Sequence, residues 1–201
     1  MKRSSRDERR EAIAEAVWRV IRRDGVASAS VRAVADEAKM STGSLRHFFA
    51  TQSELLLFAM TLVTVRVEKR IVGIDFDPDI RRAIRQFTDQ FVPLDEDRCE
   101  EMQVWEAFTA AAQTDSAMAA VRRDTDRTLF GHLRQFVAAL DDAGRLRPGA
   151  SVDVEAMRLH AVVDGLASHG VCDRTRMTPE VIGRVLDAHF DTLVLPDRSD
   201  G

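Results

Sequence analysis

The sequence predicts an all-α protein of about nine helices, with a small N-terminal three-helix domain ahead of a larger helical domain. Apolar residues recur every three or four positions through most of the 201 residues, which is the period of an amphipathic helix. The 10 glycines and 5 prolines are few, and they lie between these periodic segments. No segment alternates between apolar and polar residues convincingly enough to be a strand.

Each of the first four predicted helices follows a serine or threonine of the kind that caps helix N-termini. Gly25 and Gly73 are the expected ends of the first and the fourth, because glycine adopts the backbone conformation that commonly terminates a helix. The four helices are expected over residues 5–24, 31–38, 42–49 and 52–71, after Ser5, Ser30, Ser41 and Thr51.

Five further helices are expected in the rest of the chain. Asp77 followed by Pro78 marks the start of the fifth, and Thr178 followed by Pro179 marks the ninth, since proline is favoured in the first turn of a helix. The stretch RLRPGAS is a loop, and residues 197–201 are expected to be a frayed tail. The five helices are expected over residues 77–93, 97–113, 115–144, 152–171 and 178–195.

Composition places the protein in the cytoplasm. The two cysteines, at positions 99 and 172, are too few for a disulfide framework, which favours a reducing compartment. The N-terminal residues are charged and lack the apolar core of a signal peptide. The longest uncharged apolar run, residues 55–65, is too short to span a bilayer, so no membrane partner is expected.

Charge is distributed unevenly along the chain. Residues 1–50 hold 11 Lys and Arg against 7 Asp and Glu, a net charge of +4, whereas the other 151 residues hold 18 against 26, a net −8. A basic N-terminal part favours phosphate groups, and an acidic body is repelled by them. Ordinary variation in surface charge would give the same difference, so charge alone leaves nucleic-acid binding open.

The stretch MSTGSLRHFFATQSELL, residues 40–56, contains a helix too short and too weakened by glycine to be stable alone. With the helix before it and the three-residue turn at 39–41, it forms a helix-turn-helix arrangement, whose second helix enters the DNA major groove. Leu45, Phe48 and Phe49 are expected to anchor it to its neighbours. A three-helix core without a role in DNA binding would have the same spacing, and this alternative stays open on spacing alone.

A resemblance supports the DNA-binding interpretation. The segment IAEAVWRVIRRDGVASASVRAVADEAKMSTGSLRHFFATQSELL, residues 13–56, resembles the N-terminal domain of TetR-family transcriptional regulators without a gap. The stretches WEAF, AGRLRPG and HAVVDGLASHGVCDRTRMTPEVIGRVLDAHFDTL resemble, more loosely, the regulatory domain of the BetI-like subgroup. The resemblance implies a DNA-binding domain over residues 1–53 and a helical effector-binding and dimerisation domain over residues 54–196.

The family pattern also implies which residues face DNA. Arg46 is the strongest candidate for a bidentate contact with guanine. His47 and Gln52 depart from the pattern, because many members have a phosphate-binding tyrosine and lysine at these positions. Ser41 and Thr51 can donate to phosphates, although capping explains both without DNA. The candidate DNA-binding residues are Arg32, Ser41, Thr42, Gly43, Ser44, Arg46, His47, Thr51 and Gln52.

The resemblance implies that the C-terminal domain binds a small molecule. Aromatic and methionine residues are concentrated in this domain, and they would suit an apolar or amphipathic ligand. Such residues at helical spacing are more often core, so the alternative for each of them is structural. The candidate pocket residues are Phe58, Leu62, Phe87, Phe91, Met102, Trp105, Phe108, His132 and Phe136.

The resemblance also implies a homodimer. The last two predicted helices can form it, since the eighth is apolar almost all round and is expected to be covered on two sides. A monomer whose ninth helix covers only its own core is the alternative. The candidate interface residues are Ala161, Gly165, Val181, Val185, Leu186 and Phe190.

These expectations combine into a sequence-specific regulator, with a double-stranded DNA operator, a homodimeric assembly and release by a small-molecule effector. The alternatives are regulation by a protein partner or by nothing, and a helical enzyme, for which no convergent acid–base set is present. No cofactor is expected. His160 and Asp164 are four residues apart, and His169 and Cys172 three apart, but no further metal ligands can be identified, so no metal site is predicted.

Overall fold

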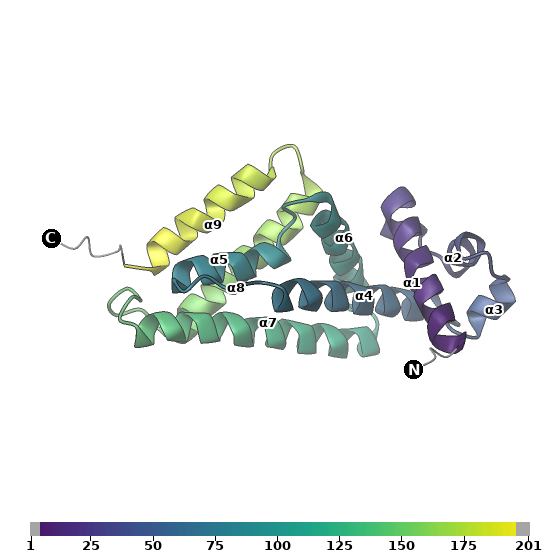
Figure 1. Cartoon of the computed structure of the whole chain (residues 1–201), viewed down its shortest axis with the longest axis horizontal. Coiled ribbons are helices and arrows are strands. Elements are labelled where there is room, and N and C mark those ends of the chain that lie inside the picture. The colour runs from purple at the N-terminus through teal and green to yellow at the C-terminus, as the bar shows by residue number, and fades with distance from the viewer. Residues whose placement is uncertain (1–4, 196–201) are drawn as a thin grey trace. The chain divides into compact units, whose positions relative to one another are not determined.

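The computed structural model describes residues 5–195, with the side chains of residues 5–7 and 11 left undescribed. Over this range the chain forms nine α-helices, two 3₁₀ helices and no strand, which confirms the predicted class (Figure 1). No helix in this range combines the length and apolar character needed to cross a bilayer. The cap expected from the Ser5 side chain and the tail at 197–201 lie outside the described residues. The helices are α1 (Ser5–Asp24), η1 (Val26–Ser28), α2 (Val31–Glu37), α3 (Thr42–Arg46), α4 (Gln52–Val72), α5 (Ile80–Thr88), η2 (Asp89–Phe91), α6 (Glu96–Ala111), α7 (Ser116–Asp142), α8 (Val152–Cys172) and α9 (Pro179–Leu193).

The chain divides into two compact units. Unit 1 comprises the residues up to Glu68 together with Gln103–Ala119, and unit 2 comprises Lys69–Met102 together with the residues from Ala120 onward. Helices α4, α6 and α7 therefore contribute residues to both units. This division by compactness differs from the functional division after residue 53, which stays a prediction.

The core of unit 1 is built from the apolar faces of its helices. α2 contacts both α1 and α3, as Figure 1 shows at the N-terminal end of the chain. α1 and α4 supply buried side chains at the three-to-four-residue spacing that the sequence displays. The buried residues include Ile13 and Val17 of α1, Val34 of α2, Leu45 of α3 and Leu55 of α4.

Three predicted helix ends are wrong in detail. The fifth predicted helix ends at Thr88 rather than near residue 93, because the chain continues as the 3₁₀ helix η2. α3 ends at Arg46 rather than near residue 49. The N–H groups of His47 and Phe48 donate to the carbonyls three residues back, at 3.3 and 2.8 Å, so residues 47 and 48 form a turn, which the Phe49 N–H closes by donating to the Leu45 carbonyl (2.9 Å). α5 begins at Ile80 with Asp79 as its cap, rather than at Asp77, because the Asp79 carboxylate accepts from the Arg82 N–H (3.0 Å).

Unit 2 has a core shared by α5, α7, α8 and α9. Gly170 of α8 packs closely against Pro93 and against Ile182 of α9. A methyl group there would lie 3.1 Å from Cδ1 of Ile182 and would collide with the Pro93 ring. Leu159 and Leu186 are among the side chains fully buried in this core. The absence of a side chain at position 170 therefore allows this packing.

A buried ion pair joins three elements of unit 2. Arg70, in the last turn of α4, donates to both carboxylate oxygens of Glu101 on α6, at 2.7 and 2.6 Å. Arg70 Nε also donates to Oε1 of Gln90 at 3.2 Å. The Glu101 carboxylate is fully buried, so loss of the arginine would leave a buried charge without its partner.

Candidate DNA-binding surface and effector-domain residues

The turn between α2 and α3 has a left-handed residue that is not glycine. Lys39 has a φ of 55°. Its N–H donates to the carbonyl of Asp36 (3.2 Å), and the N–H of Met40 donates to the carbonyl of Ala35 (2.9 Å). This pair of hydrogen bonds is the Schellman arrangement that ends many helices, usually with glycine at the left-handed position. The turn stops α2 abruptly and starts α3 two residues after Met40.

Serine side chains cap both helices of the pair, as predicted. Ser30 Oγ accepts from the Ala33 N–H (3.2 Å) at the start of α2. Ser41 Oγ accepts from the Ser44 N–H (3.0 Å) at the start of α3, and the two serine Oγ atoms lie 2.8 Å apart. The capping hydrogen bond therefore explains a serine at position 41 without any contact to DNA. The Ser44 side chain is exposed on the outer surface of α3.

The two faces of α3 differ in polarity. Leu45 is fully buried, whereas Gly43, Ser44 and Arg46 are exposed and Thr42 is half-buried. A Cβ atom at Gly43 would meet only Ser41 Oγ, at 3.9 Å, so the fold does not require glycine at this position. The outer face of α3 thus combines small residues with one long cationic side chain.

Arg32 and Arg46 are available for an external partner. Arg32 projects from α2 and Arg46 from α3, and both are exposed. Among the side chains that the structure describes, neither guanidinium has a partner for an ion pair or a side-chain hydrogen bond. Arginine prefers bidentate contact with base edges or phosphate oxygens, so two unpaired guanidinium groups on a helix-turn-helix suit nucleic acid.

The polar residues at the start of α4 are exposed but form hydrogen bonds within the chain. Thr51 Oγ1 accepts from the Glu54 N–H (3.1 Å), and Glu54 Oε2 accepts from the Ala50 N–H (2.6 Å), a variant of the predicted capping box. Gln52 Nε2 donates to the Ala29 carbonyl at 2.8 Å, so this amide ties α4 to the loop before α2. His47 is also exposed.

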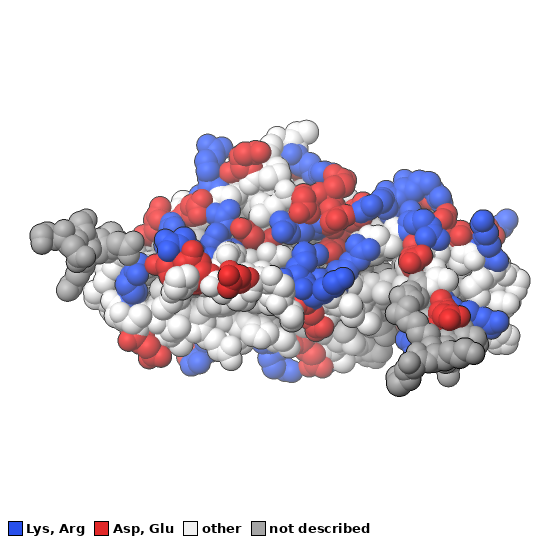
Figure 2. All heavy atoms as spheres, in the orientation of Figure 1, with Lys and Arg blue, Asp and Glu red and all other residues white. Residues whose placement is uncertain are grey.

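A carboxylate that sequence reasoning missed joins α1 to α2. Glu37 accepts from Arg19 Nε (2.7 Å) and from Arg23 Nη1 (2.8 Å). The hydrogen bonds from Arg19 and Arg23 hold the pKa of Glu37 below its ordinary value. Arg22 and Arg23 lie in the last turn of α1, and Figure 2 shows Lys and Arg side chains gathered over that end of the helix. Arg19 and Arg23 are four residues apart and so lie on the same face of α1, and this spacing could have indicated a shared acidic partner.

The nine candidate pocket residues divide between the two units. In unit 2 the Phe87 ring contacts the rings of Phe91, Phe136 and His132, with centroids 5.0, 5.2 and 5.7 Å apart. Met102 is buried in the same unit. The other four, which lie in unit 1, are Phe58, Leu62, Trp105 and Phe108.

The candidate dimer residues also fall into two groups. Ala161 and Val185 are exposed, and Gly165 and Val181 are half-buried. Leu186 and Phe190 are instead fully buried in the core of unit 2, because α9 turns them toward α5 and α8 of its own chain. These two side chains are therefore inaccessible to a partner.

Taken together, the capped α2–turn–α3 pair, its exposed arginines and the separate helical unit define a helix-turn-helix DNA-binding protein. The chain belongs to the TetR family of transcriptional regulators. Residues 13–58 match the family described as "Bacterial regulatory proteins, tetR family", and residues 80–195 match "BetI-type transcriptional repressor, C-terminal". Both resemblances seen in the sequence are thereby confirmed, and the family consists of regulators rather than enzymes.

One curated relative and two solved structures illustrate the match. The chain is 41% identical over 199 residues to the HTH-type transcriptional regulator PksA of Bacillus subtilis (strain 168), covering 98% of this chain and 95% of that protein. A transcriptional regulator from Rhodococcus sp. Rha1 is 30% identical, with a TM-score of 0.80 over 93% of this chain and 99% of that one. A regulator from Saccharomonospora viridis, solved in complex with choline, is 19% identical, with a TM-score of 0.85 over 94% and 100% of the two chains, and shows the shared fold.

Proposed function

We propose that this regulator is a cytoplasmic repressor that binds an inverted-repeat operator as a homodimer and is released by a small-molecule effector. The observation that carries the proposal is the outer face of α3. Gly43, Ser44 and Arg46 are exposed there, while Leu45 anchors the helix and Ser41 caps it. A short helix held in this way offers its N-terminal N–H groups to phosphate and its side chains to the major groove.

Individual residues take different roles in this proposal. Arg46 contacts a guanine edge, the commonest specific pairing of arginine. Arg32 reaches a base or a nearby phosphate from α2. Thr42 and Ser44 contact bases or phosphates over shorter distances, and His47 lies near the backbone. Gln52, whose amide is bonded to the Ala29 carbonyl, acts mainly by fixing the position of α4.

Exposed apolar side chains on the last two helices support the dimer. Met157 on α8 is 63% exposed and Val185 on α9 is 40% exposed, and Ala161 and Gly165 extend the α8 surface with small residues. Packing two copies of these helices against each other gives a four-helix bundle with twofold symmetry. Such a dimer places its two α3 helices in successive major grooves, about 34–36 Å apart.

The effector is proposed to be a small amphipathic molecule with a polar or cationic end. The Saccharomonospora viridis relative was solved with choline, a quaternary ammonium ion of a kind that aromatic rings attract. In this chain the rings around Phe87 supply aromatic surface within unit 2. To move the population from 99:1 bound to 1:99, an effector must prefer the released form by about 10⁴-fold in total.

Selection of bound sequences from random duplex DNA tests the DNA-binding part of the proposal. The selected site should be an inverted repeat with equal half-sites about one helical turn apart. The protein should sediment as a dimer both free and on this DNA. An asymmetric single site, or a chain that stays monomeric while binding, would contradict the dimer.

Ligand titration with and without the selected operator tests release. Tryptophan fluorescence can report binding, with Trp105→Phe and Trp18→Phe used to assign the signal to one of the two tryptophans. Operator should weaken ligand binding by the same factor by which ligand weakens operator binding. A ligand, choline being the first to test, that binds equally well in both cases does not act by this mechanism.

A further inference from the structure

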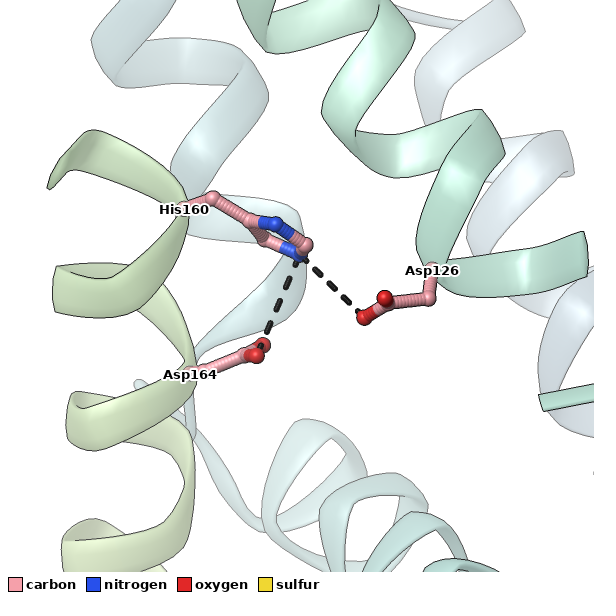
Figure 3. A group of neighbouring side chains, drawn as sticks. All are labelled: Asp126, His160 and Asp164. Atoms are coloured by element: carbon pink, nitrogen blue, oxygen red, sulfur yellow. Dashed lines mark ion pairs between the residues drawn. The ribbon is translucent and has the colours of Figure 1, made fainter. Parts of the chain in front are cut away.

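Three potential metal ligands meet on one side of unit 2. Asp126 comes from α7, and His160 and Asp164 come from successive turns of α8 (Figure 3). One ligand atom from each residue lies within 4.8 Å of the others. The sequence reveals only the His160–Asp164 pair, because Asp126 is 34 positions away and joins them through the packing of α7 on α8.

The imidazole of His160 is directed at both carboxylates. Its Nε2 atom lies 3.6 Å from Oδ1 of Asp126 and 3.9 Å from Oδ2 of Asp164, as the dashed lines in Figure 3 mark. The His160 side chain is only 13% exposed, and Nε2 itself is buried without a hydrogen-bond partner in the described part of the chain. The ring of Phe130, with its centroid 6.1 Å from that of the imidazole, packs beside it. A buried nitrogen without a hydrogen bond is costly, which calls for a partner.

The spacing of the three groups suits an ion better than direct contact. Charge-assisted hydrogen bonds between nitrogen and carboxylate oxygen are about 2.7–2.9 Å long, so 3.6 and 3.9 Å are too long. A Zn²⁺ ion lies about 2.0–2.2 Å from nitrogen and oxygen ligands, so ligand atoms roughly 3.4 Å apart surround it in tetrahedral geometry. Closing the site to that size requires only small rotations of the two aspartates, which are partly exposed.

We infer that Asp126, His160 and Asp164 bind a divalent transition-metal ion, with Zn²⁺ as the first choice. Two carboxylates balance the charge of a divalent cation, and one imidazole favours zinc, iron, nickel or copper over calcium and magnesium. Three protein ligands leave at least one coordination position for water or for another small ligand. The bound ion cross-links α7 to α8, and therefore stabilises unit 2 against unfolding.

The experiment measures zinc binding to the full chain, freed of any histidine tag and pretreated with a chelator. Competition with a chromophoric chelator gives the stoichiometry and affinity, and Co²⁺ in place of Zn²⁺ gives visible absorption from protein-bound cobalt. We expect one ion per chain and a higher thermal midpoint with zinc. His160→Ala and Asp126→Asn should each weaken binding by about 100-fold or more, since losing even an outer-shell partner of a metal ligand costs 10–100-fold.

Matched variants separate this site from other metal-binding groups. His169→Ala removes an exposed histidine from the same helix, and Asp124→Asn removes a nearby exposed aspartate of α7, and both should bind zinc as the unsubstituted chain does. Circular dichroism checks folding, and if His160→Ala does not fold, the partly exposed Asp126 still provides the test through Asp126→Asn. Absence of stoichiometric binding, or equal binding by the chain and its Asp126→Asn variant, overturns the inference. Because DNA is not used, the result is independent of the proposed operator binding.

Discussion

Arg46 is the residue of α3 best placed to read a base, because it is exposed and unpaired on the outer face of the helix. Arg46→Ala should weaken operator binding by about 1–3 kcal/mol and relax the preference at one base pair in each half-site. Binding assays against the operator and single-base variants would measure both effects. If affinity falls equally on every sequence, Arg46 contacts phosphate and carries no base preference.

Gly43 provides a second test at the same scale, because its role can be separated from folding. An added methyl group would meet only Ser41 Oγ, at an ordinary contact distance of 3.9 Å, and alanine is the better helix former, so Gly43→Ala should keep or raise stability. If the backbone of α3 approaches DNA closely, the same change should weaken operator binding by about 1–3 kcal/mol of steric cost, or about 5- to 150-fold. Thermal unfolding and operator binding measured on one preparation would distinguish the two effects. Unchanged binding would place position 43 away from the DNA.

At the scale of the element, the α2–α3 turn carries backbone strain at Lys39. A non-glycine residue in the left-handed region costs on the order of 1 kcal/mol, which glycine avoids. Glycine at this position would remove the strain, but it would also make the unfolded chain more flexible, which offsets part of the gain in stability. Lys39→Gly should therefore raise the free energy of unfolding by a few tenths to about 1 kcal/mol in urea titrations. Lys39→Ala, which keeps the strain, should not produce the gain.

Two helical glycines of unit 2 should respond in opposite directions. Gly170→Ala places a methyl group against Pro93 and Ile182 at the α8–α9 contact and should cost about 1–3 kcal/mol of stability through overpacking. Gly131→Ala in α7 meets no atom within 4 Å and should instead stabilise by about 0.5–1 kcal/mol through helix propensity. Denaturant unfolding of both variants is the measurement. Similar effects of the two substitutions would show that close approach at Gly170 is unimportant.

At the scale of the whole molecule, two groups should make stability depend on pH in separate ranges. Burial lowers the pKa of His189 from 6.5, and hydrogen bonds from Arg19 and Arg23 lower the pKa of Glu37 from 4.5. In both cases the unfolded chain binds more protons than the folded chain, so the free energy of unfolding falls as pH falls. The loss due to His189 begins below about pH 6.5, and the loss due to Glu37 begins only below about pH 4.5.

Urea unfolding at a series of pH values would separate these contributions. His189→Leu should flatten the dependence between about pH 7 and pH 5 and leave the acid range unchanged. Glu37→Gln should reduce the pH dependence below about pH 4.5 and leave the range between about pH 7 and pH 5 unchanged. Each variant therefore serves as the control for the other. If the His189→Leu chain has the same slope as the unsubstituted chain near pH 6, the histidine is not held neutral by burial.

Local features of the molecule could be predicted in advance because they depend on residues close together in the chain. The caps at Ser30, Ser41 and Thr51 are present as expected, since each needs only a hydroxyl and an N–H three residues on. The end of α3 was harder to predict, because Phe48 and Phe49 continue the apolar pattern beyond the point where the hydrogen bonds change. At the start of α5 either Asp77 or Asp79 could cap the helix. The structure has Asp79 as the cap, while Asp77 accepts a hydrogen bond from the Asp79 N–H, and this depends on the path of the backbone.

By itself, the sequence determined the helical class, the positions of the helices and the helix-turn-helix, because helical period, capping and turn chemistry act within a few residues. Only the tertiary structure decided which faces meet. It buries Leu186 and Phe190 in their own core, joins Gln52 to Ala29, and brings Asp126 of α7 to His160 of α8. Such contacts depend on how whole helices pack, and one sequence carries no local signal for the partner of a side chain tens of residues away.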